Sequence, residues 1–143
     1  MKLTQLSVFL ENREGRLARV ARILGEANIN IVAMSLADTS DFGILRMIVN
    51  DVEKAQEVLR LNNFTCAKTA VIAADVPNVP GGLATVLELI DRSKLNIEYM
   101  YALSEPHTGK TALIFRFDDL DKALAEFQAD GIAMLSAADL LKN

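Results

Sequence analysis

The chain has 143 residues, of which 51% are hydrophobic, and its net charge at pH 7 is -4. This acidic balance argues against nucleic acid or a membrane surface as the main partner, because both are bound through basic patches. No apolar run approaches the ~20 residues that a membrane-spanning helix needs. The single cysteine, Cys66, excludes an internal disulfide and fits a reducing cytoplasm, where we expect the protein to reside.

The first half of the chain predicts the order strand, helix, strand, strand, helix, strand. Its first segment alternates in polarity, as a half-buried strand does and a signal peptide does not. Apolar side chains from Leu17 to Leu24 then recur at the spacing of an amphipathic helix. The expected elements are strands over Lys2–Leu10, Ile29–Leu36, Ile44–Val49 and Phe64–Ala67, a helix over Gly15–Ala27, a turn over Ala37–Gly43 and a second helix capped by Asp51.

The second half predicts the same order of elements. They are strands over Val71–Val76, Leu95–Leu103, Lys110–Phe117 and Ile132–Leu135, a helix with an apolar stripe from Leu83 to Ile90, a turn over Glu105–Gly109 and a helix capped by Asp118 or Asp119. This order is the ferredoxin-like βαββαβ unit, in which two helices cover one face of an antiparallel sheet. The fold class expected is therefore α+β, with two such units.

The two halves are also related residue by residue, at an offset of 66. The aligned pairs are Asn12 and Asn78, Gly15 and Gly81, Leu17 and Leu83, Ala18 and Ala84, Val20 and Val86, Asn30 and Asn96, Ile31 and Ile97, Met34 and Met100, Gly43 and Gly109, and Ile48 and Ile114. A shared hydrophobic rhythm alone would not align glycines and asparagines, so the pattern indicates an internal repeat. Two residues are inserted before the last helix, where Asp51–Ala55 fits Asp119–Ala123.

The repeat predicts two domains, residues 1–68 and 69–143, and no linker rich in Pro, Gly or Ser separates them. The predicted strand Ile29–Leu36 is apolar on both faces, and the segment Leu45–Val49 shares this property. A sheet that is apolar on both faces is buried on both. We therefore expect the helix-free face to pack on a second copy of the chain, which makes the protein a homodimer.

The segment Val76–Leu83, with the sequence VPNVPGGL, is followed by Asn96 and Ile97 at the start of a strand. This pattern resembles the ACT domain, and Asn12–Leu17 with Asn30 and Ile31 resembles it more loosely. The resemblance implies small βαββαβ regulatory modules that bind amino acids, typically in enzymes of amino-acid metabolism, with their antiparallel sheets side by side and the helices on one face.

The resemblance further implies that the ligand lies between the two domains. One site would join the loop Asn78–Leu83 with Asn30 and Ile31, and the other would join Asn12–Leu17 with Asn96 and Ile97. The candidate ligand-binding residues are Asn12, Arg13, Gly15, Arg16, Leu17, Asn30, Ile31, Asn78, Val79, Pro80, Gly81, Gly82, Leu83, Asn96 and Ile97. Glycines and a helix start can approach a carboxylate, and an asparagine amide can serve either end of a zwitterion.

Each of these residues also has a plainer explanation. The glycines can be turn residues that lead into a helix, Asn12 and Asn78 can cap helices, and Asn30 and Asn96 can turn the chain into a strand. Metal binding is not expected, because the chain has one cysteine and one histidine, His107, which falls in a predicted turn.

The sequence therefore predicts a non-catalytic regulatory or sensor protein that binds a free amino acid and needs no cofactor. Branched-chain, aromatic and histidine ligands all remain open. An alternative is a ligand-free regulatory subunit that docks on a metabolic enzyme through its sheet face. A small enzyme on the same fold is a third interpretation, for which the sequence offers no recognisable acid–base or nucleophile set.

Overall fold

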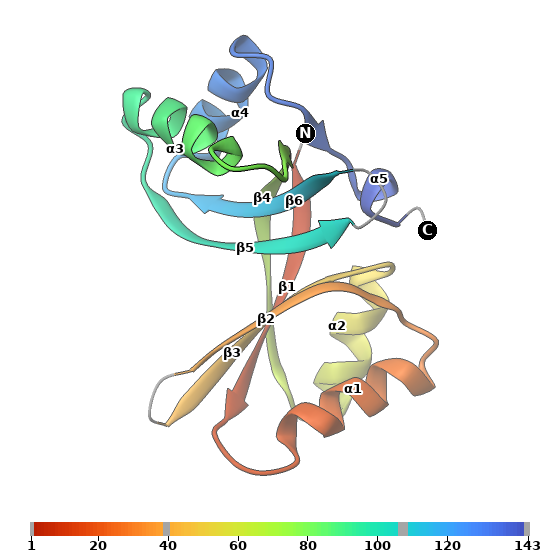
Figure 1. Ribbon diagram of the computed structural model, residues 1–143. Coiled ribbons are helices and arrows are strands. Elements are labelled where there is room, and N and C mark those ends of the chain that lie inside the picture. Colours follow the sequence, from red (N-terminus) through yellow and green to blue (C-terminus); the bar gives the residue numbers. More distant parts are fainter. Residues whose placement is uncertain (1, 39–40, 106–108, 142–143) are drawn as a thin grey trace. The chain divides into compact units, whose positions relative to one another are not determined.

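A computed structural model describes residues 2–38, 41–105 and 109–141, without the side chains of 104 and 105 (Figure 1). The chain forms two compact units: the first is Thr4–Thr69, and the second is Ala70–Asn143 together with Met1–Leu3. Each unit has the predicted βαββαβ order and an antiparallel sheet with helices packed on one side. The predicted turns and His107 fall partly or wholly on residues 39–40 and 106–108, outside the described residues.

The first unit has a sheet with the strand order β2-β3-β1-β4. Its elements are β1 (Leu3–Glu11), α1 (Arg16–Glu26), β2 (Ile31–Asp38), β3 (Phe42–Val49), α2 (Val52–Leu61) and the first part of β4 (Thr65–Pro77). Leu6, Val8 and Leu10 alternate along β1 and are buried in one core with Leu24 of α1 and Leu59 of α2. The amphipathic stripes of both helices thus meet one face of the sheet.

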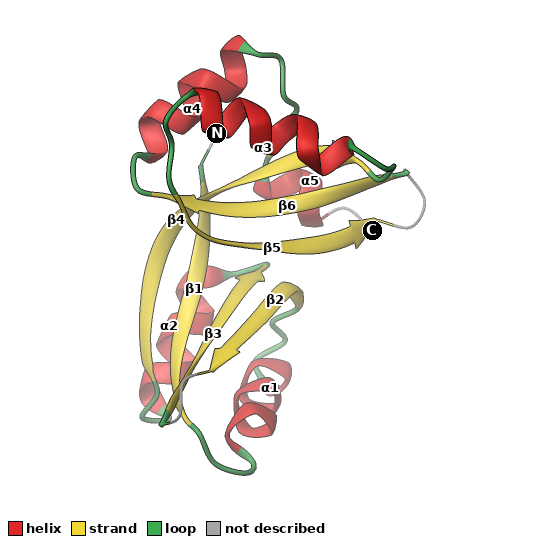
Figure 2. Ribbon diagram, turned by 60° about the vertical axis from the view of Figure 1, so that its left-hand side comes forward, coloured by secondary structure: helices red, strands yellow, loops and turns green. Residues whose placement is uncertain are grey.

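The second unit has the strand order β7-β4-β6-β5. Its elements are the rest of β4, α3 (Gly82–Arg92), β5 (Ile97–Glu105), β6 (Lys110–Phe117), α4 (Leu120–Ala129), β7 (Met134–Leu135) and α5 (Ala137–Leu141). Figure 2 shows α3 and α4 together on one face of this sheet. The rings of Phe115, Phe117 and Phe127 lie with centroids 5.3 to 6.0 Å apart at the centre of the core.

Two of the helices begin at the aspartate caps that the sequence predicts. Asp51 caps α2 by accepting a hydrogen bond from the Lys54 N–H at 3.1 Å, and Asp119 caps α4 through Lys122 in the same way. Both predictions are confirmed. No helix within the described ranges is long and apolar enough to cross a membrane.

Two predictions about strand boundaries are wrong. The predicted strands Phe64–Ala67 and Val71–Val76 are one continuous strand, β4, because no proline or glycine lies between them to end it. The last strand is only Met134–Leu135. It starts later than predicted because Gly131, with a φ of 70°, and Ile132, whose N–H donates to the Phe127 carbonyl at 3.0 Å, still belong to the end of α4. The Ser136 hydroxyl donates to Asp139 Oδ2 at 2.9 Å and accepts from the Asp139 N–H at 3.1 Å, which starts α5.

The repeat also has a different register from the predicted one. Met34 of β2 pairs with Met47 of β3, whereas Met100 of β5 pairs with Phe115 of β6. The strands β2 and β5 therefore align at an offset of 66, and the strands β3 and β6 align at an offset of 68. The two extra residues therefore lie in the hairpin between β5 and β6. The aligned pairs Gly43 with Gly109 and Ile48 with Ile114 are wrong. Gly43 pairs with Leu10 inside β3, while Gly109 precedes β6 with a φ of 70°.

Candidate functional site

Glycine opens the first helix of each unit in a left-handed conformation. Gly15 precedes α1 with a φ of 82°, and Gly81 precedes α3 with a φ of 86°. The N-cap residue of each helix is this glycine, which has no side chain to bond the first N–H groups. Asn12 and Asn78 are thus not the N-cap residues of these helices. An uncapped helix start presents backbone N–H groups and a partial positive charge, which suit an anion.

Gly82 has a second, steric reason to be glycine. A Cβ at this position would lie 2.2 Å from the carbonyl oxygen of Pro77, so the loop 77–82 folds too tightly for any side chain. Arg16 occupies the matching position of the first unit, and its guanidinium carbon lies 4.4 Å from the ring centroid of Phe64. The two loops are thus built differently, although both enter a helix through a left-handed glycine.

Asn30 and Asn96 enter the strands β2 and β5 with their backbone groups fixed and their side chains exposed. The Asn30 N–H donates to Asn50 Oδ1 at 3.0 Å, and the Asn96 N–H donates to Asp118 Oδ1 at 3.1 Å. Both backbones are thus held where the chain enters a strand. The exposed amides retain the capacity to contact a ligand.

A cavity of about 620 Å³ lies beside the start of α3 in the second unit. It is lined by Asp75, Pro77, Val79, Pro80, Gly81, Gly82, Thr85, Val86, Lys110 and Gly131–Ala133. Four of the predicted residues, Val79 to Gly82, meet in this cavity. Asn78 and Leu83 are exposed but do not line it, and Ile97 packs against the core.

Two charged residues that line this cavity, Asp75 and Lys110, were not among the predicted site residues. Asp75 Oδ2 lies 3.6 Å from Lys110 Nζ, and the Asp75 side chain is only 13% exposed. Its other oxygen, Oδ1, is buried and accepts no hydrogen bond from any described residue. One signal was available, because Asp75 is the only charged residue in the apolar run Val71–Val76.

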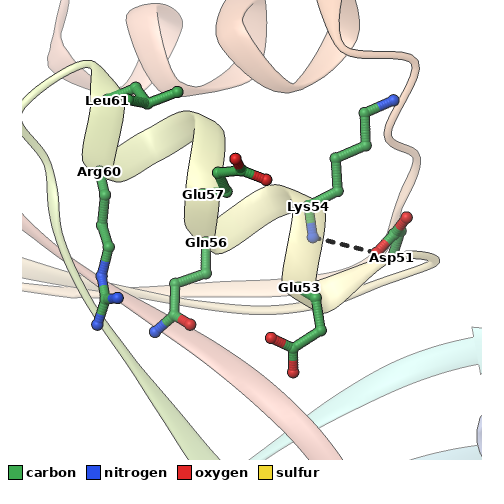
Figure 3. A pocket seen from close by; sticks show the side chains of 7 residues that line it. All are labelled: Asp51, Glu53, Lys54, Gln56, Glu57, Arg60 and Leu61. Atoms are coloured by element: carbon green, nitrogen blue, oxygen red, sulfur yellow. Dashed lines mark hydrogen bonds between the residues drawn. The ribbon is translucent and has the colours of Figure 1, made fainter.

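A second hollow, of about 640 Å³, runs along α2 (Figure 3). It is lined by Asp51, Glu53, Lys54, Gln56, Glu57, Arg60 and Leu61. Figure 3 shows that all of these side chains project from one helix and its cap residue, and that Asp51 is engaged with the Lys54 N–H. Because no loop or second element contributes to this hollow, it is a weaker candidate than the cavity beside α3.

Within the described residues, no group of three or more His, Cys, Asp or Glu side chains is placed to hold a metal ion. The two predicted sites each join residues of both units and stay predictions: Asn78–Leu83 with Asn30 and Ile31, and Asn12–Leu17 with Asn96 and Ile97.

The sequence of two βαββαβ units matches an ACT domain pair over residues 1–142. The chain belongs to the ACT domain pair family. This ACT domain pair is 39% identical to protein BT0572 from Bacteroides thetaiotaomicron, over 100% of this chain and 98% of that chain, with a TM-score of 0.93. None of the curated proteins matches the chain.

The ACT domain pair also resembles two regulatory subunits of aspartate kinase. The ligand-free subunit from Thermus thermophilus is 18% identical, with a TM-score of 0.66, over 90% of each chain. The subunit from Thermus flavus is 17% identical, with a TM-score of 0.62, over 97% of this chain and 92% of that chain. At these identities the likeness establishes the fold alone.

Proposed function

We propose that this ACT domain pair is a non-catalytic regulatory protein that binds a free amino acid, with the loop Asn78–Leu83 as its main contact. The observation that carries the proposal is the cavity at the uncapped start of α3, walled by Val79–Gly82. A carboxylate would bind the backbone N–H groups at the helix start, and the lack of side chains at Gly81 and Gly82 lets the ligand approach.

The likeness to regulatory subunits of aspartate kinase supports a regulatory role. Binding regulates only when the ligand prefers one conformational or assembly state over another. We propose that this preference is passed to a separate partner, such as an enzyme of amino-acid metabolism, in the cytoplasm. The predicted contribution of Asn30 and Ile31 to the same ligand is part of this proposal, as is the second site at Asn12–Leu17 with Asn96 and Ile97.

The test is a thermal-shift screen of the purified protein against the twenty amino acids at millimolar concentration. A ligand that binds only the folded state raises the free energy of unfolding, by about 2.7 kcal/mol at a hundredfold excess over its Kd. We expect one chemical class of amino acid to raise Tm. No shift with any amino acid would favour the alternative, a ligand-free subunit that docks on an enzyme through its sheet.

Two matched variants locate the site. Val79 and Leu61 are both aliphatic and 60% and 75% exposed, so glutamate is tolerated at either position. Val79→Glu places a charge at the cavity beside α3 and should abolish the thermal shift. Leu61→Glu changes the hollow along α2 and should leave the thermal shift intact. If Leu61→Glu abolishes the shift and Val79→Glu does not, the ligand binds in the hollow along α2 and not beside α3.

We further propose that the protein is a homodimer through the helix-free face of the first unit. Phe9 and Phe42 lie on this face and are 44% and 59% exposed, which is unusual for phenylalanine. Sedimentation velocity at micromolar concentration should give a dimer that Phe42→Glu dissociates. A stable wild-type monomer would contradict this proposal.

A further inference from the structure

We propose that two arginines of α1, Arg16 and Arg19, close the space in the first unit that corresponds to the cavity beside α3. In the second unit this space is open, because the matching residues are Gly82 and Thr85. Given the proposed function, on which this inference rests for its ligand, these positions decide which of the two units admits an amino acid.

The counterpart of the cavity in the first unit follows from the repeat. One wall of the cavity beside α3 is the start of that helix, and its counterpart is the start of α1. Another wall is the segment 131–133, which follows α4 and corresponds to the segment 63–65 after α2. Both segments leave their helix in the same way, because Asn63 and Gly131 have φ values of 68° and 70°.

In the first unit, both arginines reach from α1 to the end of α2 and the segment that follows it. The guanidinium carbon of Arg16 lies 4.4 Å from the ring centroid of Phe64, which corresponds to Ile132 in the wall of the cavity. The Nε atom of Arg16 is buried, so this side chain fills interior space. Arg19 Nη2 donates a hydrogen bond to Asn62 Oδ1 at 3.1 Å. A cation–π contact and a hydrogen bond thus join the two walls.

In the second unit, neither matching residue can make such a bridge. Gly82 has no side chain, and a Cβ at this position would lie 2.2 Å from the Pro77 carbonyl oxygen. Thr85 has a short side chain, and its hydroxyl donates to the Gly81 carbonyl at 3.1 Å, within the first turn of its own helix. The space between α3 and the segment 131–133 therefore stays open, with a volume of about 620 Å³.

The consequence is that a ligand enters between the first helix and the last segment of a unit only in the second unit. In the first unit a ligand would have to displace Arg16 from the ring of Phe64, with loss of the cation–π contact and of the packing of the arginine stem. A ligand at the second proposed site, at Asn12–Leu17, must therefore lie outside this space.

The first experiment measures access to this space without any ligand. Val86 lines the cavity, and its counterpart Val20 is 0% exposed. Each is replaced by cysteine in a chain that carries Cys66→Ala, and the reaction of the new thiol with methyl methanethiosulfonate is followed by mass spectrometry. We expect Val86→Cys to react at least about tenfold faster than Val20→Cys. Replacing both arginines, by Arg16→Ala and Arg19→Thr, should raise the rate of Val20→Cys by a similar factor.

The control for the arginine variants is Arg22→Ala, which removes a third, exposed arginine of α1 and should leave the rate of Val20→Cys unchanged. All rates are measured well below the Tm of each variant. Equal rates for Val20→Cys and Val86→Cys, or no increase when both arginines are replaced, would overturn the inference. An equal increase with Arg22→Ala would overturn it too, because a general loss of stability would then expose the thiol.

The reciprocal change closes the cavity of the second unit. Thr85→Arg gives α3 the arginine that α1 has, and Asp130, the counterpart of Asn62, offers an acceptor. This variant should slow the reaction of Val86→Cys about tenfold and abolish the thermal shift that amino acids cause. The matched control is Ala84→Arg, which adds the same side chain at an exposed position of α3 outside the cavity and should change neither quantity.

The two readouts separate this inference from the proposed function. If the thiol rates follow the arginines but no amino acid raises Tm, the arginines close the first unit and the proposed function fails. If amino acids raise the Tm of the wild type and of Thr85→Arg equally, the inference is overturned and the proposed function stands.

Discussion

Asn50 binds both backbone hydrogen-bonding groups of Asn30. Its Oδ1 accepts from the Asn30 N–H at 3.0 Å, and its own N–H donates to the Asn30 carbonyl at 3.2 Å. In the second unit Asp118 makes the same two bonds with Asn96, at 3.1 and 3.2 Å. The residue that follows β3 or β6 thus holds the backbone of the residue that precedes β2 or β5. The accepting oxygen belongs to an amide in the first unit and to a carboxylate in the second.

Replacing Asn50 tests this relationship. Asn50→Ala removes the acceptor for the Asn30 N–H and should lower the free energy of unfolding by about 0.5–1.5 kcal/mol. Asn50→Asp restores the oxygen that the second unit uses and should recover most of the loss. Urea denaturation of the three proteins measures the effect, and equal losses in both variants would contradict the role of the side-chain oxygen.

Gly81 and Gly82 should respond differently to alanine. Gly81→Ala meets open space among the described residues, with nothing within 4 Å of the new Cβ, but must keep a φ of 86°, which costs about 1–2 kcal/mol. Gly82→Ala would place its Cβ 2.2 Å from the Pro77 carbonyl oxygen, so the loop must move. We expect Gly82→Ala to be the more destabilising in thermal denaturation and to weaken ligand binding as well. A smaller loss of thermal stability in Gly82→Ala than in Gly81→Ala would show that the loop 77–82 can move to accommodate a Cβ.

The ion pair of Lys2 with Asp121 should be visible in a titration. Lys2 Nζ lies 2.8 Å from Asp121 Oδ1, and the hydrogen bond and charge of Lys2 hold the pKa of Asp121 below its ordinary value of 3.8. A carboxyl whose pKa is lowered in the folded state stabilises the protein above its unfolded pKa, and this contribution is lost as the pH falls through the folded pKa.

The measurement for this pair is an NMR titration of the Asp121 carboxyl between about pH 5 and pH 2. Lys2→Met removes the partner and should raise the midpoint toward 3.8. Lys94→Met, which removes a different exposed lysine of the same unit, should leave the midpoint unchanged. An unshifted midpoint in Lys2→Met would show that the pair is not formed in solution.

The buried thiol of Cys66 should react slowly. Burial raises its pKa above the ordinary value of 9.0, against a smaller opposing effect of the Arg60 charge. The thiolate is the reactive form, so both burial and the raised pKa protect it. At pH 8, modification by a disulfide reagent should be at least about tenfold slower in the native protein than in urea. Equal rates would place Cys66 at an accessible surface.

Much of the fold could be predicted from local signals. The stripe Leu17–Leu24 and the cap Asp51 mark their helices because helix periodicity and capping depend only on nearby residues. The continuity of β4 and the true register of the repeat could not be predicted in this way. Both depend on which strand pairs with which, and the two extra residues that shift the register lie in a hairpin that leaves the apolar alternation on each side unchanged.

In the candidate site, too, the locally determined residues could be predicted and those brought together by strand pairing could not. The loop residues Val79–Gly82 could be predicted because glycine and proline determine local conformation. Asp75, Lys110 and Ala133 could not be assembled from the sequence, because β4 pairing with β6 and the return of the chain after α4 bring them together. The Asp75 N–H donates to the Ala133 carbonyl at 2.8 Å, a contact between segments far apart in the chain.

Lys2 and Leu3 belong to the second unit, although the whole first unit follows them in the chain. During synthesis, Leu3 leaves the ribosome before any residue of the first unit, while Asp121, the partner of Lys2, is made long after that unit is complete. All residues of the first unit are therefore available before the second unit is made. The second unit can form only after its carboxyl-terminal half is synthesised, and until then Lys2 and Leu3 have no partners from that unit. Separating the two units at Thr69 would deprive the second of a buried leucine, so a functional dissection of the pair should carry Lys2 and Leu3 along.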